Sequence, residues 1–223
     1  MKIKLLIVGV AVVTALTGCA TSTTNYAPPI AKTVQNNRQI NQSFETVWDR
    51  LVKQLSSDFF VINNIDKNSR LINLSFTSQR PSDFVDCGRT SRTFKNARGD
   101  QNYTYNTADS SQFTSTNTQG HAFNVRRTAK LEGRTNIYVA PEGIGTLVSV
   151  NTKYVVNVTM SAIGFDGSNG GTENFTFDFS TKQPFTDGQI SCMALGVIES
   201  KILGLADNND PNTLPNQSCE SSG

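Results

Sequence analysis

The sequence has 223 residues, of which 20 are Lys or Arg and 18 are Asp or Glu, giving a formal net charge of +2 at pH 7. A charge so close to neutral does not indicate a nucleic-acid-binding protein, and we expect no nucleic-acid partner. The length suits one domain of moderate size or two small ones, and the single histidine excludes a zinc site built from several histidines.

The first residues have the pattern of an export signal. Two lysines, Lys2 and Lys4, precede an apolar run from Leu5 to Leu16. The run is shorter than the roughly 20 residues that a membrane-spanning helix needs, so it indicates a cleaved signal. It ends in Leu16-Thr17-Gly18-Cys19, which resembles the lipobox of bacterial lipoproteins. An ordinary secretory signal with a chance cysteine is the alternative.

The lipobox resemblance implies a signal peptide over residues 1–18 and a mature protein that begins at Cys19. In that family the cysteine sulfur carries a diacylglyceryl group, and the new amino terminus is acylated with a fatty acid such as palmitate. The implied partner is a lipid bilayer bound through acylated Cys19, because two or three acyl chains give stable anchoring. Ala20 is not the aspartate associated with inner-membrane retention. The resemblance therefore implies an outer-membrane lipoprotein that faces the periplasm.

A tether and a helix are expected next. Residues 19–42 contain Pro28-Pro29 and many Thr, Asn and Gln without periodicity, which predicts a flexible tether. Ser43–Ser56 is the clearest helix, because its apolar residues recur at helical spacing and Ser43 can act as the N-cap. We expect its Trp48 to lie in the core rather than to bind a ligand.

A β-hairpin and a polar segment follow the helix. Phe59–Ile65 and Leu71–Thr77 are β-branched and aromatic runs on either side of Asp66-Lys67-Asn68-Ser69, which predicts a hairpin. Residues 80–120 are rich in Ser, Thr, Asn and Gln, with scattered aromatic residues. So long a polar excursion is usually functional or partly disordered, and we expect it to be the element that contacts a partner.

The strand pattern returns after the excursion. Residues 131–139, 148–160 and 175–179 alternate in polarity with a period of two, which predicts three long strands in an antiparallel meander. A second helix is expected from Gln189 to about Leu205, with Cys192 in its first turn. Residues 207–223 contain two prolines and predict a disordered tail.

Three cysteines remain besides Cys19, namely Cys87, Cys192 and Cys219. Export to an oxidising compartment favours one disulfide, and three pairings are open. We favour Cys87–Cys192, because both residues lie beside segments with strand or helix patterns. By the chain-entropy model, closing a loop of about a hundred residues would contribute roughly 4–5 kcal/mol.

Basic side chains could form a binding patch for lipid phosphates, peptidoglycan carboxylates or an acidic protein. The alternative is that these charges are simply solvated. The candidate residues are Arg89, Arg92, Lys95, Arg98, Arg126 and Arg127.

The order of elements predicts an α+β domain over residues 43–206, an antiparallel sheet packed on one face by two helices. Residues 43–51, 59–62 and 66–72 resemble the helix-grip modules of BamC-type lipoproteins of the outer-membrane barrel-assembly machinery. The shared pattern is a tryptophan helix, an apolar strand, an Asp turn and a second strand. The resemblance implies a helix-grip-like fold and an accessory role in an envelope complex.

The motifs of several enzyme classes are missing from the sequence. It has no P-loop or Rossmann glycine pattern, and Gly167-Ser168-Asn169-Gly170 does not match the GxSxG elbow. His121 would have to serve in any His-dependent catalysis, and it lies at the edge of the polar excursion. We therefore expect no enzyme, cofactor or metal.

The function that we expect is that of a membrane-anchored binding or accessory subunit of a cell-envelope complex, with an envelope protein as its partner. The alternative is a carrier that holds a lipid or other apolar ligand in a cavity between helix and sheet.

Overall fold

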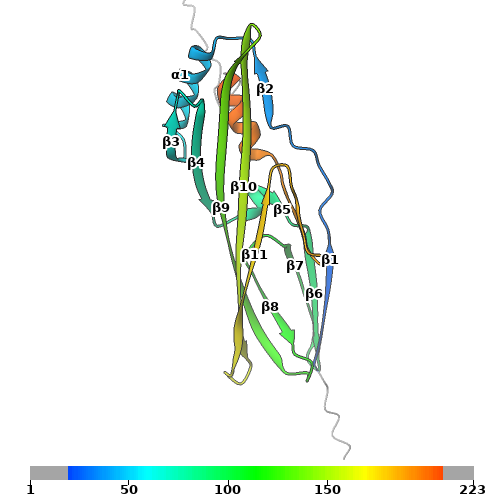
Figure 1. Ribbon diagram of the computed structural model, residues 1–223. Coiled ribbons are helices and arrows are strands. Elements are labelled where there is room, and N and C mark those ends of the chain that lie inside the picture. Colours follow the sequence, from blue (N-terminus) through cyan, green and yellow to red (C-terminus); the bar gives the residue numbers. More distant parts are fainter. Residues whose placement is uncertain (1–19, 208–223) are drawn as a thin grey trace, which may run out of the picture.

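The computed structural model describes residues 20–207 (Figure 1). The predicted signal peptide, Cys19, Cys219 and the predicted tail after Asp207 lie outside the described residues. The described chain is an α+β structure in which antiparallel strands predominate. Among residues 20–207, no helix is both long enough and apolar enough to cross a bilayer.

Three long strands form the predicted antiparallel meander. β9 and β10 alternate in burial along most of their length, and β11 does so only near its end, at Phe177 and Phe179, so the period of two correctly predicted these strands. Val148 pairs with Val139, and Val158 pairs with Phe175. The strands are β9 (Ala122–Glu142), β10 (Gly145–Gly164) and β11 (Asn169–Ser180).

Further strands extend this sheet on both sides. β4 pairs with one half of β9 and β8 with the other half, while β2 pairs with the start of β10. β3 and β4 form the predicted hairpin, whose turn is held by the Asp66 carboxylate. The Ser69 hydroxyl and the N–H groups of Ser69 and Asn68 donate to this carboxylate, and these hydrogen bonds lower the pKa of Asp66. The added strands are β2 (Asn37–Ile40), β3 (Val61–Asp66), β4 (Leu71–Ser78) and β8 (Ser111–Thr116).

The first helix, α1 (Phe44–Leu55), matches its prediction. Ser43 is the N-cap, and its hydroxyl oxygen accepts a hydrogen bond of 3.3 Å from the Thr46 N–H. Trp48 is 4 % exposed and belongs to the core, as expected. α1 contacts the second helix through Arg50, whose guanidinium donates to the Ala206 carbonyl at 2.6 Å.

The second helix, α2 (Val197–Asp207), begins eight residues later than predicted. Cys192 lies in the strand β13 (Ser191–Ala194), so the prediction that it sits in a helical turn is wrong. Gly196 adopts a φ of +79°, which favours glycine and separates the strand from the helix. The spacing of four residues between Ala194 and Ile198 is typical of a helix. In the structure Ala194 is buried in the strand β13 and Ile198 is buried in the helix α2.

A buried polar group joins α2 to the long sheet. The Glu199 carboxylate is fully buried, and both of its oxygens lie 3.1 Å from the Tyr154 hydroxyl on β10. Thr181 donates a further hydrogen bond of 2.6 Å to this carboxylate. Burial and the neighbouring carboxylate raise the pKa of Tyr154, so the phenol stays protonated and remains a donor.

The predicted tether contains two β-strands. Residues 21–27 form β1, which pairs along its whole length with β6 (Arg89–Asn96), and residues 37–40 form β2. The tether prediction is therefore wrong for these residues. The low apolar content of residues 19–42 indicated disorder, but β1 is an edge strand whose partner lies more than sixty residues later in the chain.

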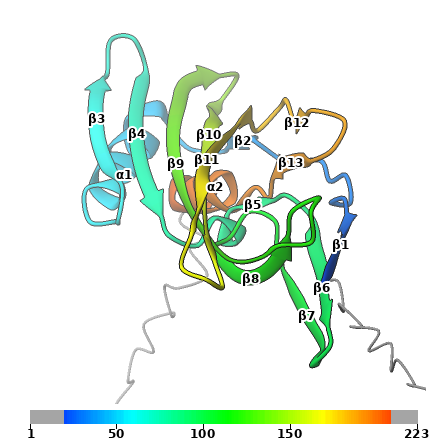
Figure 2. The same ribbon diagram turned by 90° about the horizontal axis from the view of Figure 1, so that it is seen from below.

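The polar excursion is folded as well. β1 (Thr21–Ala27), β6 (Arg89–Asn96) and β7 (Gly99–Asn106) form a second sheet. A short 3-10 helix, η1 (Pro81–Asp83), leads into a small third sheet of β5 (Val85–Asp86), β12 (Phe185–Thr186) and β13. Figure 2 shows β1, β6 and β7 on one side of the molecule and α1, β3 and β4 on the other.

Candidate functional site

A pocket of about 350 Å³ opens between the second sheet and the long meander. We call it the β1–β11 pocket. Its floor is formed by Val158, Met160, Phe175 and Phe177 from β10 and β11. Its wall is formed by Thr24, Tyr26, Thr90, Arg92, Tyr105, Thr107 and Arg127, and its rim by Asp187, Gln189 and Ile190.

The floor of the pocket is apolar because β10 and β11 present one face of their alternating side chains to it. Val158 is 2 % exposed and Phe177 is 5 % exposed, so these residues belong to the core as well. Phe175, which pairs with Val158 across the two strands, remains 41 % exposed. The floor thus offers an aromatic surface to a bound group.

Arg92 supplies the polar side of the wall. Its Nε donates to the Tyr105 hydroxyl at 3.0 Å, and its Nη1 donates to the Thr24 hydroxyl at 2.9 Å. The guanidinium carbon lies 4.1 Å from the centre of the Phe113 ring, a cation–π contact. Tyr105, Thr24 and Phe113 hold the guanidinium in one orientation, and Arg92 stays only partly buried.

Arg127 has a different place in the wall. The residue is 5 % exposed, and its guanidinium donates to the carbonyls of Thr107 and Asp109, at 2.5 Å for Thr107. Burial lowers the pKa of this guanidinium, although Tyr105 and Asp109 oppose the shift. Arg127 therefore holds the segment after β7 against β9.

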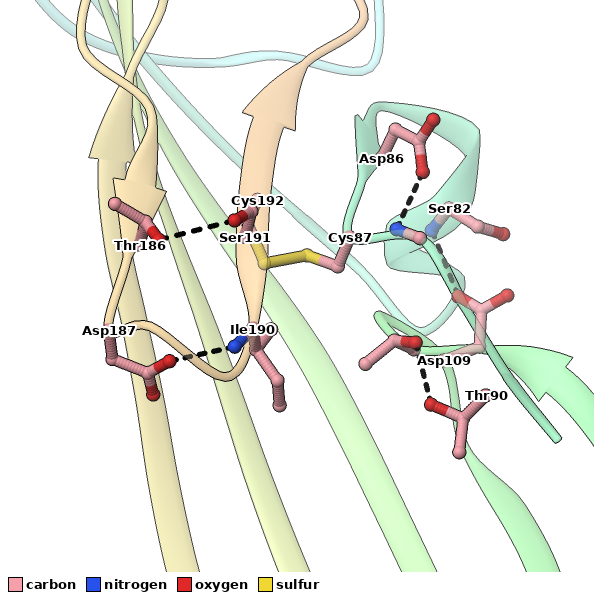
Figure 3. The surroundings of a disulfide bond; sticks show 12 residues. Ser82, Asp86, Cys87, Thr90, Asp109, Thr186, Asp187, Ile190, Ser191 and Cys192 are labelled. Atoms are coloured by element: carbon pink, nitrogen blue, oxygen red, sulfur yellow. Dashed lines mark hydrogen bonds between the residues drawn. A yellow bond between two sulfur atoms is a disulfide. The ribbon is translucent and has the colours of Figure 1, made fainter. Parts of the chain in front are cut away.

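A disulfide ties the pocket rim to the second sheet. Cys87 and Cys192 are bonded, as predicted, with their Cα atoms 4.0 Å apart (Figure 3). The bond joins the start of β6, through Gly88, to β13. Cys87 is 1 % exposed and Cys192 is fully buried.

Hydrogen bonds close to the disulfide fix the rim further. Tyr26 of β1 accepts from the Ser191 N–H at 2.9 Å and donates to the Ser191 carbonyl at 3.1 Å. The Asp187 carboxylate accepts from the N–H groups of Gln189 and Ile190, and these bonds lower its pKa. The contact between Asp187 and Ile190 is drawn in Figure 3.

The six basic residues predicted as a patch do not share one face. Arg89 and Lys95 point away from Arg92 because a strand alternates its side chains, and Lys95 pairs with Asp100 at 2.9 Å. Arg98 lies in the turn after β6. On β9, Arg126 is exposed while its neighbour Arg127 is buried. The structure brings only Arg92 and Arg127 of the six to the β1–β11 pocket.

Other predicted chemistry can be placed too. His121 is exposed and lines a shallow hollow with Phe165 and Asp166 near the β10–β11 turn. Within residues 20–207, no group of three or more His, Cys, Asp or Glu side chains could hold a metal ion.

Sequence reasoning missed the role of Tyr26, because it lies in the predicted tether, and of Phe175, which was assigned only to a strand face. No protein-family model matches this chain, and searches of curated proteins and of solved structures also found no match.

Proposed function

We propose that the protein is an outer-membrane lipoprotein, anchored by acyl chains on Cys19, whose periplasmic domain is a binding or accessory subunit of a cell-envelope complex. The β1–β11 pocket is the observation that carries the binding role, because it is an apolar-floored opening whose rim is held by a disulfide. The lipobox sequence supports the anchor.

An envelope protein is the partner that the pocket suits best. A volume of about 350 Å³ is near the lower end of the range of roughly 300–1,000 Å³ for ligand pockets. A pocket of this size suits a few side chains of a partner protein. Phe175 would contact their apolar parts, and the Arg92 guanidinium would bind an acidic or carbonyl group of the partner.

A carrier of fatty acids or similar amphiphiles is the second candidate, favoured by the combination of an apolar floor with a guanidinium. The cavity first expected for a carrier was between helix and sheet, and buried side chains occupy that space. Among them are Leu51, Ile198 and Ile202, each fully buried.

We also propose that the two helices cover one face of the long sheet in a helix-grip-like arrangement, as in the BamC-type modules. The bond between Glu199 on α2 and Tyr154 on β10, and the burial of Trp48 on α1, support this packing.

The anchor is tested by fatty-acid labelling. We expect labelled palmitate to enter the protein in growing cells, and the Cys19→Ala variant to take up none and to leave the membrane fraction, because it lacks the acceptor sulfur. Cys219→Ala is the matched control and should label as the parent does. Palmitate uptake by Cys19→Ala would disprove the assignment of the anchor.

The pocket is tested by crosslinking in intact cells from a photoreactive residue at Gln189 on the rim. We expect an envelope protein to be captured, and Phe175→Lys to abolish that capture by placing a charge on the apolar floor. Tyr138→Lys is the matched control, since Tyr138 is 40 % exposed and Phe175 is 41 % exposed. Equal loss in both variants would argue against the pocket, and capture of fatty material alone would favour the carrier.

A further inference from the structure

The chain enters the folded domain at one end of the molecule. Residue Thr21, the first of β1, pairs with Lys95 near the end of β6. The Thr116 N–H, at the end of β8, donates to the Ser22 hydroxyl at 3.0 Å. Only Ala20 separates β1 from Cys19.

Three turns gather at this end. The β6–β7 turn follows Lys95, and the β8–β9 turn lies between Thr116 and Ala122, which pair with each other. Phe123 pairs with Gly164, which begins the β10–β11 turn. The rings of Phe94 and Phe165 lie 6.3 Å apart, so β6 and the β10–β11 turn are in contact. We call this region, made of residues 96–99, 117–121 and 163–169 beside Ala20, the anchor end; it is the lower end in Figure 1.

The anchor end exposes two large apolar side chains. Phe165 is 59 % exposed and Ile163 is 58 % exposed, whereas Phe94, which contacts Phe165, is 1 % exposed. Phe94 is the side chain that is buried at this position, so packing within the domain does not explain why a large apolar residue is present at Phe165. The exposed Arg98 in the neighbouring turn adds a long cationic side chain of the kind that reaches phosphate groups at a membrane surface.

Chain length determines what these side chains can meet. Consecutive Cα atoms are about 3.8 Å apart, so the Cα atoms of Cys19 and Thr21 can be separated by no more than about 8 Å. An acylated Cys19 would therefore hold the anchor end directly against the bilayer, with no long tether between them. Aromatic and aliphatic side chains held at the bilayer surface are stabilised when they enter the interface between headgroups and acyl chains.

We propose that the anchor end is a membrane-contacting surface, in which Phe165 and Ile163 enter the lipid interface beside the acyl chains of Cys19. This inference rests on the proposed lipid anchor. It orients the domain, since β9 has 21 residues and at about 3.3 Å per residue spans up to about 70 Å. Helix α1, which carries Trp48, and helix α2 then lie at the end away from the bilayer (Figure 1).

The test uses full-length lipidated protein in vesicles of phosphatidylethanolamine and phosphatidylglycerol that contain acyl-brominated phospholipids, which quench tryptophan on contact. Trp48 is the only native tryptophan and serves as an internal reference. In Phe165→Trp, we expect the brominated lipids to remove most of the added emission. In the matched control Ile144→Trp, at the opposite β9–β10 turn and 93 % exposed in the parent, the added emission should persist.

The outcomes separate this inference from the lipid anchor. Flotation with the vesicles together with equal emission from Phe165→Trp and Ile144→Trp would overturn the membrane-contacting surface and leave the anchor standing. Failure of the parent protein to float would overturn both. A blue shift of the Phe165→Trp emission on vesicle binding gives a second readout that supports the contact.

Discussion

Replacing Cys87 and Cys192 together by alanine is expected to lower the free energy of unfolding by about 4–5 kcal/mol. The bond joins residues 105 positions apart, and its loss releases a long loop in the unfolded chain. For a domain of this size the loss corresponds to a fall in melting temperature of about 8–20 °C. Urea unfolding of the parent and the double variant, both without reductant, measures the difference.

The control for this experiment is Cys219→Ala, which should unfold as the parent does. A stability loss in the control equal to that of the double variant would contradict the Cys87–Cys192 assignment. Reduction of the parent should reproduce most of the effect of the double variant, because both remove the same cross-link. We also expect reduction to weaken capture from Gln189, because the rim of the β1–β11 pocket is tied through β13.

Replacing Arg127 by methionine is expected to cost about 2–6 kcal/mol of stability. The guanidinium satisfies the carbonyls of Thr107 and Asp109, and the thioether cannot donate to either one. Each buried acceptor left without a donor costs about 1–3 kcal/mol. Methionine keeps the unbranched apolar stem of the side chain, so the loss reports mainly on the hydrogen bonds.

Arg126→Met is the matched control, because the two residues are adjacent on β9 and only Arg127 is buried. Its expected effect on the free energy of unfolding is within about 0.5 kcal/mol. Equal stability of the two variants would show that Arg127 does not support the wall of the pocket. A larger loss for Arg126→Met would reverse our assignment of the two side chains.

The disulfide and Arg127, which are removed in these variants, stabilise the walls of the pocket that we propose as the binding site. The disulfide, Tyr26 and Arg127 hold three chain segments around the β1–β11 pocket. None of the three needs to contact a partner. Phe175, which is 41 % exposed, and the partly buried Arg92 also line the pocket and are our candidates for direct contact.

Local patterns in the sequence predicted the elements whose partners are close in the chain. Alternation along β9, β10 and β11 identified the meander, since a buried face imposes a period of two on each strand. The turn at Asp66 identified the hairpin, because its carboxylate can bind the next N–H groups without distant residues. The helix α1 was predicted from its N-cap Ser43 and its apolar face, because both features also depend only on residues close in the chain.

The wrong predictions concern segments that depend on distant partners. Residues 21–27 have no apolar alternation, and they become β1 only because β6 offers its backbone N–H and C=O groups. Residues 191–194 carry an apolar spacing compatible with a helix, but the disulfide and the pairing with β5 make them a strand. Backbone pairing across a long loop leaves little trace in local sequence.

The sequence by itself determined the meander, the hairpin and the first helix, and it supplies the lipobox on which the anchor proposal rests. It favoured the pairing of Cys87 with Cys192, which the structure then selected from three open pairings. Only the tertiary structure decided that residues 21–27 are folded, that Arg92 and Arg127 meet at one pocket while Arg126 does not, and that Phe165 lies at the end where the chain enters. Periodicity records which face of an element is buried, because burial selects residue types locally. It does not record which distant strand supplies the burial, because backbone hydrogen bonds form with almost any side chain.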